Sequence, residues 1–226
     1  MSTITQPVLT PSQITDIVSY VNTIRAYHQA PPMSWSPTIA KVSQQWSYYL
    51  TANNLFQHSG NNAYGENLAF LQGYGRDPVA LIKKSIDLWY AELSAYDFTK
   101  PGFSPATGHF TCLVWVNSTQ FGFGLSINDA TNAVNIVMNT SPPGNYLGQF
   151  QQNVLPLVTN PNPNPGPSPS PSPSPGPSPN PNPNPTPYTS SNTITDLYAV
   201  LQLIYTNRKK SDIVAAINSI ILKLSL

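Results

Sequence analysis

Apolar residues recur at helical spacing in three segments of the first hundred residues. The first segment carries branched side chains at steps of three and four: Ile14, Ile17, Val18, Val21 and Ile24. The preceding Thr-Pro-Ser-Gln at residues 10–13 has the order of a capping box with proline at the first helical position. Two further segments begin at Ser-Pro and Asp-Pro pairs, at residues 36–37 and 77–78, and continue to Leu50 and Trp89. We therefore predict three amphipathic helices.

The pattern changes after Gly108. Short stretches rich in Val, Ile, Phe and Trp follow, separated by turn residues, around 110–116, 121–127 and 133–138. Such stretches are typical of strands. Helices followed by a short antiparallel sheet predict an α+β domain in layers rather than a repeated strand–helix–strand unit.

Proline sets the boundary of this domain. It occupies every odd position from Pro161 to Pro187, which excludes helices and central strands. We predict a disordered, semi-rigid linker over 159–188, with a reach of about 80 Å for polyproline II at ~3.1 Å per residue. A ligand for a proline-recognising domain and a modified stalk remain alternatives.

Residues 189–226 form a separate segment with two amphipathic runs. The first has apolar residues at helical spacing: Ile194, Leu197, Tyr198, Leu201, Ile204 and Tyr205. The second has Ile213, Ile217, Ile220 and Leu224. Two short helices cannot bury such faces alone. We expect homo-oligomerisation through 191–226, with docking to a partner or a membrane surface as alternatives.

The composition of the chain excludes several classes of function. Charged residues make up 8% of the chain and the net charge is +1, so we expect no nucleic-acid partner. The single cysteine, Cys112, excludes an internal disulfide and a cysteine-based zinc cluster. The N-terminus lacks the pattern of a secretory signal and no apolar run is long enough to span a membrane. We therefore expect a cytoplasmic or peripheral membrane protein, with non-classical secretion or display on a particle as alternatives.

Three motifs carry a family resemblance. They are Tyr-Gly-Glu-Asn-Leu-Ala at 64–69, shortly after His58; Trp-Tyr-Ala-Glu at 89–92; and Gly-His-Phe-Thr-Cys-Leu-Val-Trp at 108–115. Their order and spacing resemble the CAP superfamily of cysteine-rich secretory, antigen 5 and pathogenesis-related proteins, closest to its Golgi-associated pathogenesis-related branch. The resemblance implies an α-β-α sandwich, the SCP domain, over 10–158, after an N-terminal extension of residues 1–9.

The resemblance also implies a cleft that contains His58, Glu66, Glu92 and His109. Two imidazoles and two carboxylates suit a divalent cation, Zn²⁺ or Mg²⁺, with His58 and His109 as ligands and the two glutamates as further candidates. We expect no organic cofactor. Alternatively, Glu66 and Glu92 only brace loops through buried hydrogen bonds.

No nucleophile accompanies these residues. A Gly-x-Ser-x-Gly elbow is absent, Cys112 falls in a predicted apolar strand, and Ser59 is the only hydroxyl close to His58 in sequence. We therefore predict a non-enzymatic binding protein, for which the resemblance implies association with lipid, sterol or a membrane surface. A His/Glu-dependent hydrolase and a structural or adhesive head on a proline-rich stalk remain alternatives.

We expect His28 to lie exposed at a helix end.

Overall fold

A computed structural model describes residues 3–158 of the 226-residue chain. The predicted linker and helical tail lie outside these residues. The described elements follow one another as β1 (Ile4–Thr5), α1 (Pro11–Tyr27), β2 (Ser34–Trp35), α2 (Pro37–Asn53), β3 (Gly65–Gln72), α3 (Pro78–Ala91), the 3₁₀ turn η1 (Glu92–Ala95), α4 (Gly108–Leu113), β4 (Gln120–Asn128), β5 (Ala133–Ser141) and α5 (Phe150–Asn153). None of the described helices is long and apolar enough to cross a membrane.

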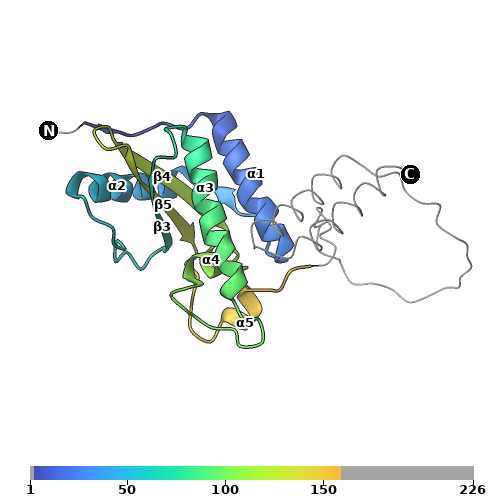
Figure 1. Cartoon of the computed structure of the whole chain (residues 1–226). Coiled ribbons are helices and arrows are strands. Elements are labelled where there is room, and N and C mark those ends of the chain that lie inside the picture. The colour runs from blue at the N-terminus through green and yellow to red at the C-terminus, as the bar shows by residue number, and fades with distance from the viewer. Residues whose placement is uncertain (1–2, 159–226) are drawn as a thin grey trace, which may run out of the picture. The chain divides into compact units, whose positions relative to one another are not determined.

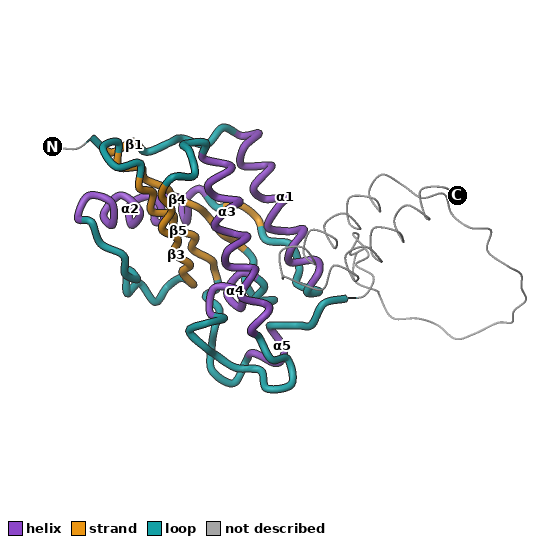
Figure 2. The backbone as a smooth tube through the Cα atoms, viewed as in Figure 1, coloured by secondary structure: helices purple, strands orange, loops and turns teal. Residues whose placement is uncertain are grey.

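The sheet lies between two layers of helices. Helices α1 and α3 cover one face and α2 covers the other (Figure 1). The long strands β4, β5 and β3 are antiparallel neighbours that lie side by side (Figure 2). The strand order is β1-β4-β5-β3, which leaves β3 at one edge of the sheet. This arrangement confirms the predicted α+β fold and α-β-α sandwich.

Helix α1 begins where the sequence predicts. The Thr10 hydroxyl accepts a hydrogen bond from the backbone N–H of Gln13, whose side chain accepts one from the backbone N–H of Thr10. The two helices that begin at Pro37 and Pro78 are confirmed as well. In each, the residue before proline caps the first turn with its side chain.

The main core fills the space between the sheet and α1, α3 and α4. Its members are apolar and almost fully buried, and include Ile17, Val21, Leu81, Ile86, Trp89, Phe110, Trp115, Phe121 and Ile136. The other layer is partly polar. Ser43 and Thr51 on one side of α2 donate hydrogen bonds to the β4 carbonyls of Gly122 and Ser126. The Ser47 hydroxyl shares a hydrogen bond with the Ser126 hydroxyl, so α2 lies close against the sheet.

One predicted strand is wrong. Residues 108–113 form the short helix α4, although the sequence around 110–116 predicts a strand. Residues 110–115 are all buried, so no alternation of apolar and polar positions distinguishes helix from strand here. The predicted strands near 121–127 and 133–138 are confirmed as β4 and β5, and β3 coincides with a motif whose strand character was not predicted.

A buried arginine joins α1 to the segment around α4. Arg25 is fully buried and its guanidinium donates hydrogen bonds to four backbone carbonyl groups, those of Pro31, Leu113, Trp115 and Ser118. Burial lowers the pKa of Arg25 to about 10, so the group stays charged at neutral pH. The hydrogen bonds fix the loop that follows the third sequence motif, and therefore the position of α4.

Candidate functional site

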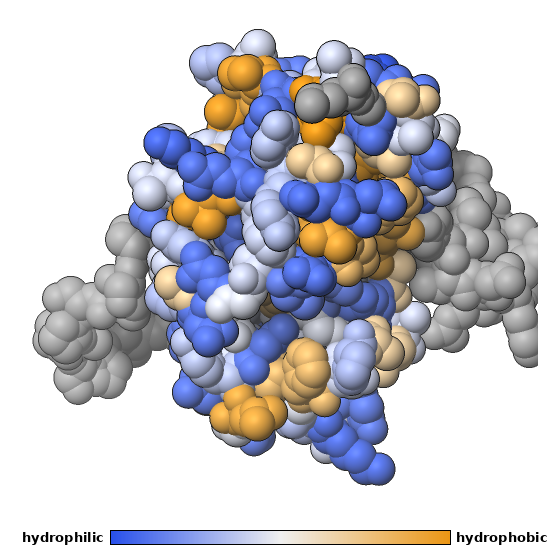
Figure 3. Space-filling model, turned by 90° about the vertical axis from the view of Figure 1, so that its left-hand side faces the viewer, coloured by the Kyte–Doolittle hydropathy of each residue, from blue (hydrophilic) through white to orange (hydrophobic). Residues whose placement is uncertain are grey.

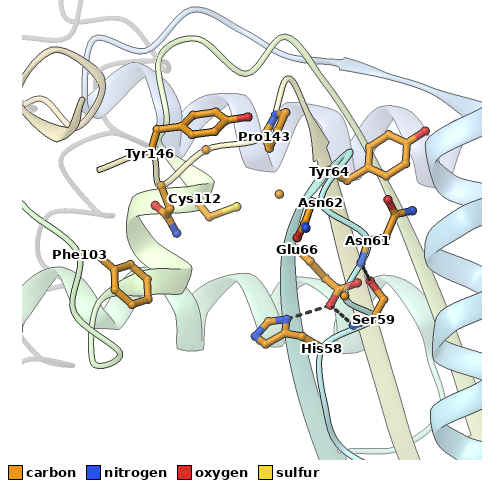
Figure 4. Close-up of a pocket in the computed structure, with 14 residues that line it drawn as sticks. His58, Ser59, Asn61, Asn62, Tyr64, Glu66, Phe103, Cys112, Pro143 and Tyr146 are labelled. Carbon is orange, nitrogen blue, oxygen red and sulfur yellow. Dashed lines mark hydrogen bonds and ion pairs between the residues drawn. The ribbon is translucent and has the colours of Figure 1, made fainter. Parts of the chain in front are cut away.

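The first histidine–glutamate pair lies at the start of β3. The strand presents Glu66, and the preceding loop brings His58 alongside it. Glu66 Oε1 accepts hydrogen bonds from His58 Nδ1 at 2.8 Å and from the backbone N–H of Ser59 at 2.9 Å (Figure 4). The carboxylate is largely buried, whereas the imidazole side chain is 63% exposed. The pair therefore presents an accessible imidazole held by a buried carboxylate.

The two partners shift each other's titration. The hydrogen bond that His58 donates to Glu66 is the main reason that the pKa of His58 lies above its usual value. Burial alone would raise the pKa of Glu66, but hydrogen bonds from His58 and Ser59 outweigh it and lower that pKa. Glu66 is therefore ionised at neutral pH and stabilises the protonated form of His58.

The second pair joins α4 to the end of α3. Glu92 Oε1 accepts a hydrogen bond from His109 Nδ1 at 2.6 Å, and its Oε2 accepts the backbone N–H groups of His109 and Phe110, each at 3.0 Å. The carboxylate thereby satisfies N–H groups that the first turn of a helix leaves unpaired. The Trp89 ring stacks on the His109 ring, with centroids 6.1 Å apart. Glu92 thus serves both the imidazole and the helix.

The four predicted residues form two pairs in two neighbouring hollows. His58 and Glu66 line a hollow of about 530 Å³, while Glu92 and His109 line a smaller one of about 290 Å³. Both hollows are bordered by β3 and α4, and the Asn67 side chain donates a hydrogen bond to the His109 carbonyl at 2.9 Å. The family resemblance implies one cleft for all four residues, whereas the structure places them as two pairs in separate hollows along one strand.

The two pairs leave only their imidazoles available to a cation, because both carboxylates accept hydrogen bonds from the histidines. In each pair the carboxylate holds Nδ1, which leaves Nε2 as the metal-binding nitrogen and the glutamate as the group that orients the ring. Across residues 3–158, no three His, Cys, Asp or Glu side chains group together as a metal-binding set. Imidazole donors suit Zn²⁺ better than Mg²⁺.

Among the described residues, neither candidate nucleophile is hydrogen-bonded to a histidine. The Ser59 hydroxyl accepts a hydrogen bond from the backbone N–H of Asn61, and within the described chain it makes none with His58. Cys112 lies in α4, not in a strand, and is 2% exposed. Burial raises the pKa of its thiol to about 11, so the thiolate needed for attack is scarce at neutral pH.

The larger hollow has aromatic and polar walls that lie outside the residues predicted from the sequence. Phe103 and Tyr146 lie on one side of it and Tyr64 on another, with His58 and Glu66 along its border (Figure 4). Behind Glu66, the Asn139 side chain lies 3.5 Å from its Oε2 and accepts a hydrogen bond from Ser43. Asn139 is a polar residue within an apolar strand, which is the one sequence signal that marks it for attention.

The predicted exposure of His28 is wrong. His28 ends α1 as expected, but it is fully buried. Its Nδ1 is bonded to the Leu155 carbonyl at 2.8 Å and its Nε2 lies 3.2 Å from the Tyr90 hydroxyl. The rings of Phe98 and Phe110 pack against the imidazole, so burial lowers the pKa of His28 to about 4. His28 is a structural residue.

Comparisons with known proteins match this chain to a family and to individual relatives. The profile of the CAP family, described as the cysteine-rich secretory protein family, matches residues 18–140. The chain is 37% identical over 144 residues to Protein PRY2 of Saccharomyces cerevisiae, covering 63% of this chain and 41% of that protein. It is 34% identical over 147 residues to human Golgi-associated plant pathogenesis-related protein 1, covering 62% of this chain and 91% of that protein.

Solved structures share the fold. A crystal structure of NaASP2 with Zn²⁺ superposes with a TM-score of 0.53 at 17% identity, covering 66% of this chain and 88% of that one. A structure of Na-ASP-1 superposes with a TM-score of 0.51 at 18% identity, covering 66% of this chain and 43% of that one. At such identities the likeness extends to the fold alone.

Proposed function

This chain belongs to the CAP family, and from that premise we propose that it is a binding protein whose larger hollow takes a sterol or another uncharged lipid at a membrane surface. The observation that carries the proposal is the apolar rim of that hollow. Phe103 and Tyr146 line it and are 53% and 48% exposed, and the adjacent Leu147 is 83% exposed. Exposed side chains of this kind can enter the boundary between headgroups and acyl chains.

The inner wall suits the polar end of such a ligand. His58, Ser59, Asn61 and Tyr64 line the hollow and offer hydrogen-bonding groups next to the Glu66 carboxylate. A lipid with one hydroxyl or a small headgroup can place that group inside and its apolar body against the rim. This combination of a few polar groups with apolar walls is usual for small-molecule sites.

The charge of the site selects among lipids. The lining of the larger hollow contains no lysine or arginine, and its one carboxylate is paired with His58. The chain's net charge of +1 gives a weak attraction to anionic membranes. On the face in Figure 3, apolar patches lie among polar side chains. The proposal therefore favours an uncharged ligand held by shape over an anionic lipid held by charge.

Binding is favoured over hydrolysis because the described residues provide no hydroxyl or thiol bonded to either imidazole. The proposal also includes a divalent cation, which the side chains of His58 and His109 would bind. When bound, the cation would neutralise and polarise an oxygen atom of the lipid, while Glu66 and Glu92 keep the two imidazole rings oriented.

Vesicle flotation tests this function. We expect the full chain to float with phosphatidylcholine vesicles that contain sterol, and less with vesicles that lack it. Leu147→Asp and Phe103→Asp should each lower the bound fraction several-fold because a charge would enter the acyl boundary. Val8→Asp is the matched control, since Val8 is 90% exposed and does not line the hollow. If no vesicle carries the full chain, or if Val8→Asp is as harmful as Leu147→Asp, the proposal is wrong.

A further inference from the structure

Strand β3 is an edge strand whose outer side is only partly covered. Its inner side pairs with β5 along the whole strand, from Gly65 opposite Thr140 to Gln72 opposite Ala133. On the outer side, the Trp89 indole N–H donates a hydrogen bond to the Leu68 carbonyl at 3.0 Å. An edge strand with free main-chain groups is a template for another strand.

The bond from Trp89 shows which residues face outward. In an antiparallel pair, successive residues point their N–H and C=O groups alternately toward the partner strand and away from it. Since the Leu68 carbonyl points away from β5, the main-chain groups of Phe70 and Gln72 also point away. Within residues 3–158, the outward N–H and C=O of Phe70 form no hydrogen bond.

Apolar side chains flank this free edge on both sides. The smaller hollow runs along Leu68, Ala69 and Phe70. Phe56 stands on one side and meets the Phe70 ring edge-to-face at 6.4 Å, while Leu88 and Trp89 stand on the other. Phe56 and Leu88 are 57% and 40% exposed, so the walls are open to solvent.

The groove has no lysine or arginine in its lining. Its only ionisable residues are Glu92 and His109, which are hydrogen-bonded to each other, and Glu92 also accepts hydrogen bonds from two backbone N–H groups. The one carboxylate is therefore already occupied, and no lysine or arginine lines the groove to hold an acidic ligand. An uncharged segment complements this groove.

We propose that the outer edge of β3 is a docking site for an extended, uncharged peptide segment of another protein, which adds a strand opposite Leu68–Gln72. Main-chain bonds to Phe70 would fix the register, and alternate apolar side chains would lie between Phe56 and Leu88. A lipid in the same groove would cover the main-chain groups of Phe70 without bonding them, which is unfavourable. This site is separate from the lipid hollow and does not depend on it.

The first test selects random nonapeptides displayed on phage against the full chain. We expect enrichment of uncharged sequences with apolar residues at alternate positions. A synthetic peptide of the enriched sequence should bind at least tenfold more weakly to Leu88→Asp and to Phe56→Asp, and unchanged to Val8→Asp. Both changed positions are exposed, so folding should persist, which circular dichroism checks. If selection on the full chain enriches no peptide sequence relative to selection on Leu88→Asp, the proposal is overturned.

The second test separates strand pairing from apolar adhesion. N-methylation of alternate residues of the selected peptide blocks the N–H groups of one edge at a time. Methyl groups on the edge facing β3 should reduce affinity at least tenfold, and those on the opposite edge should leave it unchanged. Binding should also slow hydrogen exchange at the Phe70 amide. Two outcomes would assign the groove to a lipid instead. One is that methyl groups on either edge of the peptide reduce its affinity equally. The other is that binding to sterol vesicles depends on Leu88 while peptide binding does not.

Discussion

The pKa values of two histidines are shifted in opposite directions, because one imidazole is buried and the other is hydrogen-bonded to a carboxylate. His28 is packed among aromatic rings without a carboxylate, and burial lowers its pKa to about 4. The hydrogen bond that His58 donates to Glu66 raises the pKa of His58. His58 therefore favours the fold at acid pH and loses that contribution as pH rises through its folded-state pKa, whereas His28 opposes the fold once acid protonates the unfolded chain.

We predict that the free energy of unfolding falls as pH is lowered from about 6.5 to 4. In that window the unfolded state binds a proton at His28 that the native state does not bind. The contribution of His28 to the free energy of unfolding is therefore complete above the window and decreases within it. The full effect is about 3 kcal/mol at ~1.4 kcal/mol per pKa unit. Urea unfolding at several pH values measures it, and His28→Gln should flatten the slope. An unchanged slope in His28→Gln would contradict this assignment.

The candidate cation site makes a prediction about Zn²⁺ affinity. His58→Ala and His109→Ala should each weaken Zn²⁺ binding to the full chain, and Glu66→Gln should weaken it about tenfold or more by releasing the His58 ring. Affinity should also fall with acidification, because protons compete for His58. Isothermal titration calorimetry measures each affinity. Asn62→Ala is the matched control from the same hollow; Zn²⁺ affinity that survives both histidine substitutions would place the ion elsewhere.

At the scale of elements, the sequence predicts structure well where periodicity and capping agree. The Thr10 capping box and the proline after each cap locate α1, α2 and α3. Periodicity fails at α4, where burial on all sides removes any polar face. It also gives no warning that His28 is enclosed, since the Leu155 carbonyl that binds it lies 127 residues away. Contacts of that range depend on the assembled fold.

The α2–β4 contact rests on two glycines, and we predict that alanine at either is strongly destabilising. A Cβ at Gly124 would lie 2.1 Å from the Gln44 nitrogen, and one at Gly122 would lie 2.2 Å from the Ala40 nitrogen. Because both obstacles are backbone atoms, no side-chain rotation relieves them. We expect a loss of about 3 kcal/mol or more, measured by thermal unfolding. Gly102→Ala is the control, since its nearest such contact is 4.0 Å; a similar loss there would contradict the argument.

At the scale of the whole molecule, the candidate site was predictable only through the family motifs. Spacing along the chain could not show that Glu66 pairs with His58 and Glu92 with His109, or that the pairs face different hollows. That division arises because β3 carries Glu66 into one hollow and Leu68 and Phe70 into the other. The aromatic rim of the larger hollow comes from loops remote in sequence, at Phe103 and Tyr146, which no single motif contains.

The apolar pattern of residues 191–226 predicts self-association. Full-length protein should form an oligomer in multi-angle light scattering, and residues 1–158 should be monomeric because they retain the core but not the amphipathic runs. Joining several weakly binding domains would strengthen attachment to one membrane without any new contact, so the full chain should bind sterol vesicles more tightly than residues 1–158. Leu201→Asp should abolish both effects, whereas Gln202→Asp, outside the apolar positions, should preserve them. Equal masses for the full chain and residues 1–158 would remove self-association from the proposed function and leave the lipid hollow to act alone.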